Sequence, residues 1–145
     1  MLEVPPGSMD LVLTSPPYAG VYDYSRHQSR RYPLFGEDGS FAEAHELGSR
    51  RDPGRYREDL GTVLRRLLEA LRPEGRILLL LGDSRDMKAD ELVAELAKGA
   101  GGRLTASASQ KRRDWSGGPP RREHLLLVER TATSSETPPV PASPR

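Results

Sequence analysis

Residues 10–18 read Asp-Leu-Val-Leu-Thr-Ser-Pro-Pro-Tyr, a short apolar run that two prolines close. Short apolar runs bounded by turn residues are typical of strands buried in a parallel sheet. Because proline has no N–H to donate to a neighbouring strand, this strand must end by Ser15. In open α/β sheets, ligands bind at the carboxyl ends of the strands. The sequence therefore predicts a ligand site at residues 15–18.

The residue types in this tetrapeptide suit a planar aromatic amine. Pro16 and Pro17 keep the chain extended and leave carbonyl groups as acceptors, Ser15 adds a hydroxyl oxygen, and Tyr18 offers a ring for stacking. The amine nitrogen of cytosine or adenine is a weak nucleophile, because its lone pair is delocalised into the ring. Acceptors that hold its N–H groups would aim that lone pair at an electrophilic methyl group. Positioning contributes about 7–11 kcal/mol in well-oriented intramolecular reactions.

The segment as a whole resembles the catalytic motif of the amino-methylating DNA methyltransferases, in the Ser-Pro-Pro-Tyr form typical of cytosine-N4 enzymes. Adenine-N6 enzymes more often have Asp or Asn where this chain has Ser15. The resemblance implies that Ser15 and the Pro16 carbonyl hold the target amine, that Pro17 shapes the loop, and that Tyr18 stacks on the base. It also implies that the target nucleotide is flipped out of the duplex, at a cost of a few kcal/mol.

The rest of the chain alternates between helical and strand patterns. Residues 18–51 are aromatic and basic with weak periodicity, which predicts short helical pieces and loops. The elements predicted beyond them are a helix from Asp52 to about Leu71, a strand at Ile77–Leu81, a helix at about Asp90–Lys98, and strands at Leu104–Gln110 and His124–Glu129. This order predicts an α/β fold with a parallel sheet, in which the Ile77–Leu81 strand is central and covered on both faces. The last two strands, joined by a basic loop at 111–122, should be antiparallel.

This order also resembles part of the class I methyltransferase fold, a Rossmann-like sheet of seven strands. The turn at residues 71–76 and the final antiparallel hairpin are similar to those of the family, and the predicted strands match its strands four to seven. The family binds S-adenosylmethionine through a glycine-rich loop after the first strand, and an acidic residue ending the second strand holds the ribose. Neither is recognisable here, since residues 99–102 are rich in glycine but follow a helix and precede a strand. The cofactor-binding residues are therefore unknown, and the main donor-binding half is expected outside this chain.

Three explanations of the missing half remain open: a start codon placed too far downstream, a partner chain that supplies the half, and a degenerate remnant. The first is favoured, because the opening residues read like the middle of a domain. If the first three strands are absent, the strand at residues 11–13 becomes an exposed apolar edge.

Basic and aromatic residues near the motif are candidates for substrate binding. One group follows the motif directly, and the other lies in the loop between the last two strands, where it would emerge at the active edge of the sheet. Basic residues contact phosphate and aromatic residues stack on bases. The candidate substrate-binding residues are Tyr22, Tyr24, Arg26, Arg112, Arg113 and Trp115. The alternative is that the tyrosines pack and that the basic side chains are solvated. Asp83 and Ser84 are interpreted as a turn.

Composition limits the remaining possibilities. The chain has 145 residues and a net charge of +1, with no cysteine and three histidines far apart in sequence, so no metal site is expected. Residues 1–130 are predicted to be a partial methyltransferase catalytic domain, and residues 131–145, rich in Pro, Ser and Thr, a disordered tail. The sequence contains neither a signal peptide nor an apolar run of membrane-spanning length, so the cytoplasm is the expected compartment.

The function expected from the sequence is S-adenosylmethionine-dependent methylation of an exocyclic amine, with cytosine N4 in DNA as the leading substrate. A base in RNA is an alternative, and a protein glutamine is a further one that Ser15 disfavours, because those enzymes usually have Asn there. A non-catalytic nucleic-acid-binding remnant is the alternative outside enzymes. The expected partners are nucleic acid, DNA first, and a chain that supplies the donor-binding half.

Overall fold

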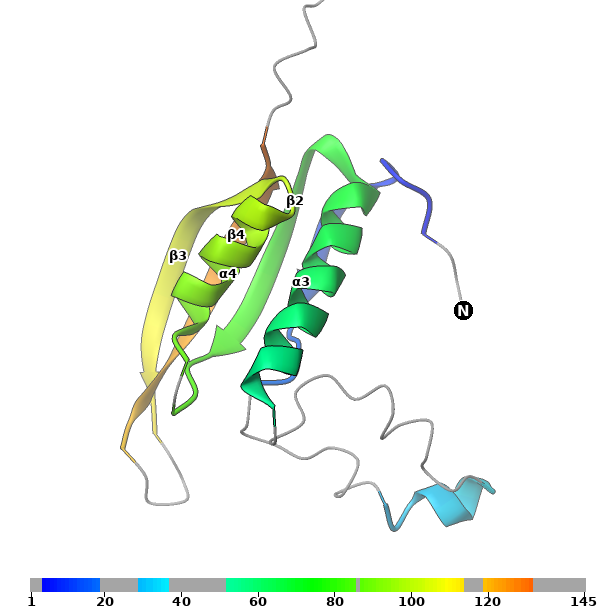
Figure 1. The fold of residues 1–145 in the computed structure, drawn as a ribbon, viewed down its shortest axis with the longest axis vertical. Helices are drawn as coiled ribbons and strands as arrows, with labels where there is room; N and C mark the ends of the chain where they lie inside the picture. Colours follow the sequence, from blue (N-terminus) through cyan, green and yellow to red (C-terminus); the bar gives the residue numbers. More distant parts are fainter. Residues whose placement is uncertain (1–3, 19–28, 37–51, 86, 114–118, 132–145) are drawn as a thin grey trace, which may run out of the picture.

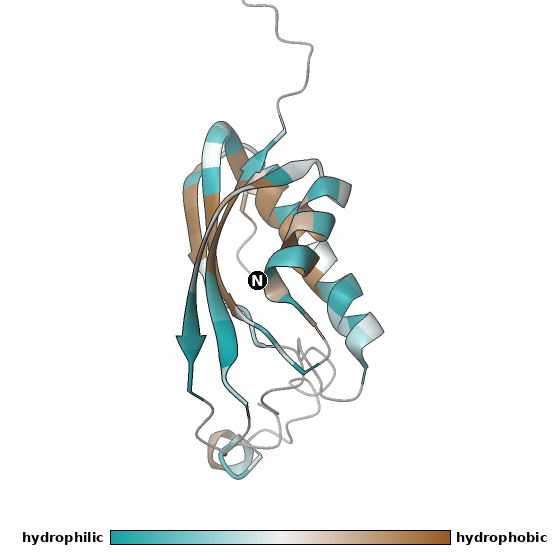
Figure 2. Cartoon of the chain, turned by 90° about the vertical axis from the view of Figure 1, so that its left-hand side faces the viewer, coloured by the Kyte–Doolittle hydropathy of each residue, from teal (hydrophilic) through white to brown (hydrophobic). Residues whose placement is uncertain are grey.

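The computed structural model describes residues 4–18, 29–36, 52–85, 87–113 and 119–131. They form two layers, a four-stranded sheet and a pair of helices that both lie on one face of it (Figures 1 and 2). The elements in chain order are β1 (Met9–Thr14), the 3-10 helix η1 (Tyr32–Phe35), α3 (Pro53–Ala70), β2 (Leu71–Gly82), α4 (Ala89–Gly99), β3 (Gly102–Arg112) and β4 (Arg121–Arg130). None of the helices in these ranges is long and apolar enough to cross a membrane.

The strand order in the sheet is β1-β2-β4-β3. β1 pairs with β2 in parallel, and β4 runs antiparallel to both of its neighbours. It follows that β1, β2 and β3 all run in one direction and end at the same edge, at the bottom of the sheet in Figure 1. We call this the carboxyl edge. The first turns of α3 and α4 lie at the same end of the molecule.

Local sequence explains where α3 begins and which face it buries. The Asp52 side chain accepts a hydrogen bond of 3.0 Å from the backbone N–H of Arg55, and Pro53 occupies the first helical position. The buried side chains are four residues apart and therefore share one face of the helix. They are Tyr56, Leu60, Leu64 and Leu68. They pack against the buried apolar side chains of β2, which include Ile77, Leu79 and Leu81.

The helix α4 completes the core. Leu92, Val93 and Ala97 are buried in the same cluster as Leu126 and Val128 of β4. A Cβ atom on Gly61 of α3 would lie 3.2 Å from a methyl carbon of Leu96, so the two helices approach closely at that position. The predicted order of helices and strands is confirmed for the described elements, and most boundaries lie within three residues of the predicted ones. The exception is β2, which begins at Leu71 and not at Ile77, so residues 71–76, predicted as a turn, belong to the strand.

A further prediction about the sheet was wrong. The strands β3 and β4 extend further towards each other than expected, so Lys111, Arg112, Arg121 and Arg122 lie in strands and not in a loop. The pairing of β3 with β4 continues beyond their apolar residues as far as Arg112 and Arg121. Backbone hydrogen bonds between strands do not require apolar side chains. The β2 strand is covered on one face only by the described elements, and Leu78 and Leu80 on its other face are half-buried.

The face of the sheet that no described element covers is apolar. Residues directly opposite in neighbouring strands share a face, which places Leu13 beside Leu78, and Leu80 beside Leu125. Leu11 and Leu13 of β1 are 58% and 70% exposed, and Leu125 is 40% exposed. We call Leu11, Leu13, Leu78, Leu80, Leu125 and Leu127 the leucine face. β1 lies at the end of the described sheet, as the sequence predicted for an apolar edge strand.

Candidate functional site

The loop that follows β1 reaches across the carboxyl edge of the sheet. The phenol of Tyr18 donates a hydrogen bond of 2.5 Å to Oε1 of Glu123 at the start of β4. Glu123 lies directly opposite Gly82, the last residue of β2, and a Cβ atom on Gly82 would lie only 2.6 Å from the Tyr18 ring. The ring therefore occupies the space that a glycine at the end of β2 leaves open.

The prolines hold this loop in place from the other side. Pro16 is buried, while Pro17 and Tyr18 are half-buried. The phenol of Tyr56, on the first turn of α3, donates a hydrogen bond of 2.9 Å to the carbonyl oxygen of Pro17. Three elements, β2, β4 and α3, thus fix the loop. Pro17 uses its carbonyl inside the protein, which leaves the exposed Ser15 and the Pro16 carbonyl as the candidate acceptors for a substrate.

Both tyrosines remain neutral far above physiological pH. Burial, and then the hydrogen bond to Glu123 and its negative charge, raise the pKa of Tyr18 to about 12, against the opposing effects of Arg112 and of a hydrogen bond with Ser15. Burial also raises the pKa of Tyr56 to about 12, with a smaller contribution from Tyr18. Tyr18 is therefore an uncharged hydrogen-bond donor, and Ser15 lies close enough to bond with it.

Arg112 lies over the same ring. Its guanidinium carbon is 5.3 Å from the centroid of Tyr18, within the range of cation–π attraction. The sequence predicted that Arg112 contacts substrate and that Tyr18 stacks on a base. With the guanidinium in this position, a base that stacks on that side of the ring must displace Arg112 or be sandwiched with it.

A buried polar chain lies next to the loop, on the face that the helices cover. Nε2 of His124 is 3.1 Å from Oδ1 of Asp83, and Nδ1 of His124 is 2.8 Å from the hydroxyl oxygen of Ser109. A neutral imidazole satisfies both contacts if Nε2–H donates to the carboxylate and Nδ1 accepts from the hydroxyl. Asp83 also accepts from the backbone N–H of Ala89, at 2.9 Å, and from Lys88.

Asp83 therefore has a structural role that sequence reasoning missed. It was interpreted as a turn residue, but it is only 3% exposed and ties the end of β2 to β4 and α4. Burial alone would raise the pKa of this carboxyl group, but the hydrogen bonds from Ala89, Lys88 and His124 outweigh burial and hold the pKa below its ordinary value. Asp83 and His124 are 41 positions apart, so no local spacing could have revealed the contact.

Two of these side chains, together with Asp90, form the one group in the described ranges that resembles a metal site. Ligand atoms of Asp83, Asp90 and His124 all lie within 4.8 Å of one another. Both ring nitrogens of His124 and both carboxylate oxygens of Asp83 are already within hydrogen-bonding distance of protein groups. A cation would have to replace those bonds, so we interpret the group as a hydrogen-bond network.

The structure brings together part of the predicted site. Ser15, Pro16, Pro17, Tyr18 and Arg112 gather at the carboxyl edge, and Arg113 follows Arg112 directly as an exposed residue at the end of β3. Tyr22, Tyr24, Arg26 and Trp115 lie outside the described residues, as does the predicted tail from residue 132 onwards. Sequence reasoning did not identify Glu123, Tyr56 and Gly82, which position the loop and come from distant parts of the chain.

The described residues do not fit the family's way of binding S-adenosylmethionine. That mode uses a glycine-rich turn between the end of a strand and a helix. The glycines with positive φ in the described ranges are Gly7, before β1, Gly36, after η1, and Gly101, between α4 and β3. None of them follows a strand, so these ranges contain no donor site of that kind.

Comparison with solved structures identifies the fold. The chain superposes on a candidate DNA modification methylase of Thermus thermophilus in complex with S-adenosyl-L-methionine, with a TM-score of 0.55, 18% identity, and coverage of 93% of this chain and 53% of that one. A selenomethionine derivative of the same protein gives a TM-score of 0.52, 17% identity, and coverage of 93% and 50%. This chain has the class I methyltransferase fold. No family model matches the sequence, and neither does any curated protein sequence.

The match extends over nearly all of this chain but only about half of the solved protein. The expected methyltransferase fold is thereby confirmed at the level of architecture.

Proposed function

We propose that this chain is the target-base part of an S-adenosylmethionine-dependent methyltransferase that modifies an exocyclic amino group, with cytosine N4 in DNA as the substrate. The observation that carries the proposal is the fixed position of the Ser15–Tyr18 loop at the carboxyl edge. Glu123, Tyr56 and the space beside Gly82 hold it there. In open α/β sheets this edge is where ligands bind.

In the proposed reaction, the chain's own residues orient the amine. The hydroxyl oxygen of Ser15 and the carbonyl oxygen of Pro16 accept the two N–H groups of the amine, which turns the nitrogen lone pair out of the ring plane. The Tyr18 ring supports the base. A bound methyl donor would supply the electrophilic methyl group, and the described residues offer no glycine-rich turn to hold it. Fixed acceptors lower the barrier because they need no reorganisation during the reaction.

The observed strand order supports a more detailed correspondence. In our proposal β1, β2, β3 and β4 are strands four, five, six and seven of the seven-stranded family sheet. The order β1-β2-β4-β3, with only β4 antiparallel to the others, agrees with this numbering. The donor-binding half would then continue the sheet beyond β1, as part of a longer polypeptide or as a partner chain. The exposed side chains of Leu11 and Leu13 support a contact there.

Product analysis tests the chemistry. The full chain is incubated with a protein that supplies the donor-binding half, duplex DNA and S-adenosylmethionine. The DNA is then digested to nucleosides, and methylated bases are identified by mass spectrometry, with RNA in a parallel reaction. The proposal predicts N4-methylcytosine in DNA. It also predicts at least a tenfold loss in Ser15→Ala, about 1.4 kcal/mol of transition-state stabilisation, and little change in Ser107→Ala, an exposed serine in the middle of β3. Methylation at carbon 5 of cytosine would contradict it.

The second candidate function is a nucleic-acid-binding remnant without catalysis, which the missing glycine-rich turn among the described residues favours. Calorimetry with S-adenosylmethionine separates the two. Donor binding by the full chain supports an enzyme with its own donor site. If the full chain neither binds the donor nor forms product, two explanations remain: a remnant, or an enzyme that needs a partner. Only the second regains activity when the donor-binding half is supplied.

A further inference from the structure

A pocket of about 790 Å³ opens at the carboxyl edge, beside the residues that hold Tyr18. Five cationic side chains and one carboxylate line it. The cations are Arg85, Lys88, Lys111, Arg121 and Arg122, and the carboxylate is Asp83. This strong local charge contrasts with the net charge of +1 for the whole chain.

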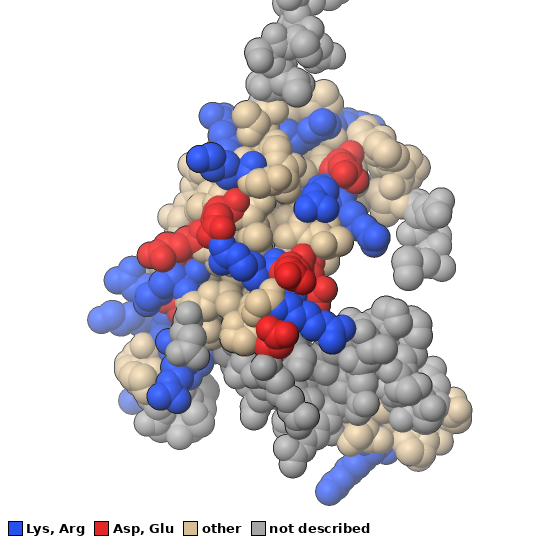
Figure 3. Space-filling model, viewed as in Figure 1, with Lys and Arg blue, Asp and Glu red and all other residues tan. Residues whose placement is uncertain are grey.

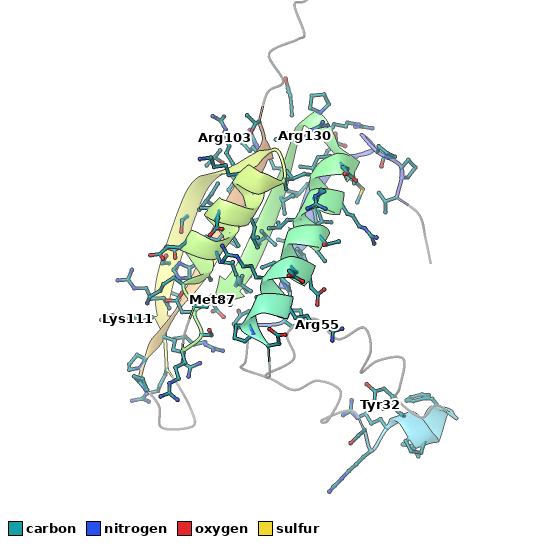
Figure 4. The ribbon with its side chains drawn as sticks, viewed as in Figure 1. Tyr32, Arg55, Met87, Arg103, Lys111 and Arg130 are labelled. Atoms are coloured by element: carbon teal, nitrogen blue, oxygen red, sulfur yellow. The ribbon has the colours of Figure 1, made fainter. Side chains whose placement is uncertain are left out.

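The cations converge from three separate parts of the chain. Arg85 and Lys88 lie between β2 and α4, Lys111 lies near the end of β3, and Arg121 and Arg122 begin β4. Figure 3 shows Lys and Arg side chains gathered at the lower left of the molecule, where β3 and β4 meet in Figure 1, and Figure 4 places the labelled Lys111 there. Only the fold brings these positions together.

At this end of the sheet, two pairs of directly opposite residues in β3 and β4 carry like charges. Lys111 lies directly opposite Arg122, and Arg112 lies directly opposite Arg121. Like charges at directly opposite positions destabilise a pair of strands. At the other end of β4, opposite charges face each other, since Glu129 forms ion pairs with Arg76 of β2 and Arg103 of β3. The cationic end therefore costs stability, which an anionic ligand would offset.

The carboxylate in the pocket does not neutralise this charge. Asp83 is only 3% exposed, and its bonds to His124, Ala89 and Lys88 use both of its oxygens. Arg85, Lys111, Arg121 and Arg122 have no ion pair with a carboxylate in the described ranges, whereas Arg57, Arg72, Arg76 and Arg103 elsewhere all do. The pocket thus presents cations whose hydrogen-bond donors are available to a ligand.

We propose that this pocket binds the phosphate backbone of a nucleic-acid strand and so sets the register of the base that enters the Tyr18 site. The inference rests on the proposed function for its ligand. Arginine binds phosphate through two parallel N–H donors, and lysine adds a point charge. Phosphate contacts position a nucleic acid without reading its sequence. The pocket and the Tyr18 site share one edge of the sheet, so one strand can contact both.

The test compares two double variants with equal charge. Arg85→Gln/Arg122→Gln alters two exposed pocket residues, and Arg65→Gln/Arg66→Gln alters two exposed residues of α3 outside the pocket. Each pair lowers the net charge from +1 to −1. Circular dichroism verifies the folding of both. Binding of the full-length proteins to a fluorescent DNA duplex of about 20 base pairs is measured by anisotropy across a salt series, with no methyl donor present.

The pocket variant is expected to bind roughly tenfold more weakly for each lost contact at about 0.1 M salt, and its log–log salt slope should fall by about 1.8 for two contacts. The α3 variant should stay within about twofold of the unmodified chain. Equal losses in the two variants would overturn the proposal, because net charge alone would explain them.

Competition at constant ionic strength identifies the source of the phosphate. The proposal predicts that unlabelled DNA competes at micromolar concentration and that inorganic phosphate and polyglutamate compete only at millimolar concentration. Micromolar competition by inorganic phosphate would assign the pocket to a free phosphate compound, and competition by polyglutamate equal to that of DNA would assign it to any acidic chain. Both results overturn the proposal. Because no methyl transfer is measured, failure of the methylation assay leaves this comparison intact.

Discussion

At the residue scale, the site depends on one glycine that leaves room for one tyrosine. Gly82 ends β2, and any Cβ atom there would lie within 2.6–2.8 Å of two carbons of the Tyr18 ring. Tyr18 in turn reaches Glu123, on the neighbouring strand. The position of the ring is therefore set by the absence of a side chain on β2 and by a hydrogen bond to β4.

Gly82→Ala should displace Tyr18 and destabilise the fold by about 1–3 kcal/mol, because ring and methyl group cannot share the space. Chemical denaturation measures the loss, and methylation or base binding should fall with it. Gly99→Ala is the matched control, since a Cβ atom there meets nothing within 4 Å. A Gly82→Ala protein with unchanged stability and unchanged base binding would show that the ring is not confined.

Asp83→Ala should cost about 2–4 kcal/mol in the free energy of unfolding, because it leaves the buried His124 and the Ala89 N–H without their partner. Asp59→Ala, which removes a half-exposed partner of Arg55, should cost less than about 0.5 kcal/mol. Urea denaturation compares the two at pH 7.

The same carboxyl group predicts a pH dependence. The fold lowers the pKa of Asp83 below its ordinary value of 3.8, so its contribution is fully present above pH 3.8 and disappears as the pH falls below that value towards the folded-state pKa. The stability difference between the unmodified chain and Asp83→Ala should therefore shrink in acid. A constant difference down to pH 2 would be inconsistent with a lowered pKa.

At the element scale, α3 links its own N-terminus to the loop. Asp52 caps the helix, and Tyr56 on the first turn bonds to Pro17. Asp52→Ala should lower stability by about 1 kcal/mol, since the N–H of Arg55 loses its acceptor, and Asp52→Asn should retain most of the stability. Thermal denaturation followed at 222 nm distinguishes them. Equal melting temperatures for Asp52→Ala and the unmodified chain would contradict the capping role.

The sequence predicted those elements whose signals are local. The cap at Asp52, the apolar spacing through Leu68, and the prolines after Thr14 gave α3 and the end of β1. It did not predict how far β3 and β4 extend, because ladder hydrogen bonds carry no side-chain signature. It also missed the contacts of Tyr18 with Glu123 and of Asp83 with His124, which join residues 105 and 41 positions apart. The residue types of the Ser15–Tyr18 loop identified it in the sequence. The residues that hold it in place are evident only in the folded structure.

At the scale of the whole molecule, the described fold leaves two surfaces without a packing or pairing partner among the described residues. They are the apolar leucine face and the outer edge of β1. A flat apolar edge strand is a site for pairing with another chain. Helices cover the opposite face, and no described element covers this one (Figure 2). This apolar surface is suited to a further layer of structure.

We predict that the chain alone self-associates at concentrations of tens of micromolar and that Leu11→Thr/Leu13→Thr shifts it towards monomer, because threonine keeps strand propensity and removes apolar surface. Leu34→Thr/Phe35→Thr is the control, since those side chains of η1 are even more exposed, at 81% and 76%. Sedimentation velocity gives the distribution of species. Equal effects of both pairs would show that general hydrophobicity, and not the sheet edge, causes association.

The central claim is that Ser15 and Pro16 accept the N–H groups of a cytosine supported by Tyr18. The most direct measurement is the affinity of the full chain for a duplex with one cytosine opposite an abasic site, compared with the same duplex carrying uracil, which has a carbonyl in place of the amine. Mispairing lowers the cost of flipping the base. We predict that the cytosine duplex binds at least about tenfold more tightly than the uracil duplex, a difference of about 1–3 kcal/mol in binding free energy. Ser15→Ala should reduce this difference in affinity. Equal affinity for the two duplexes would contradict the account.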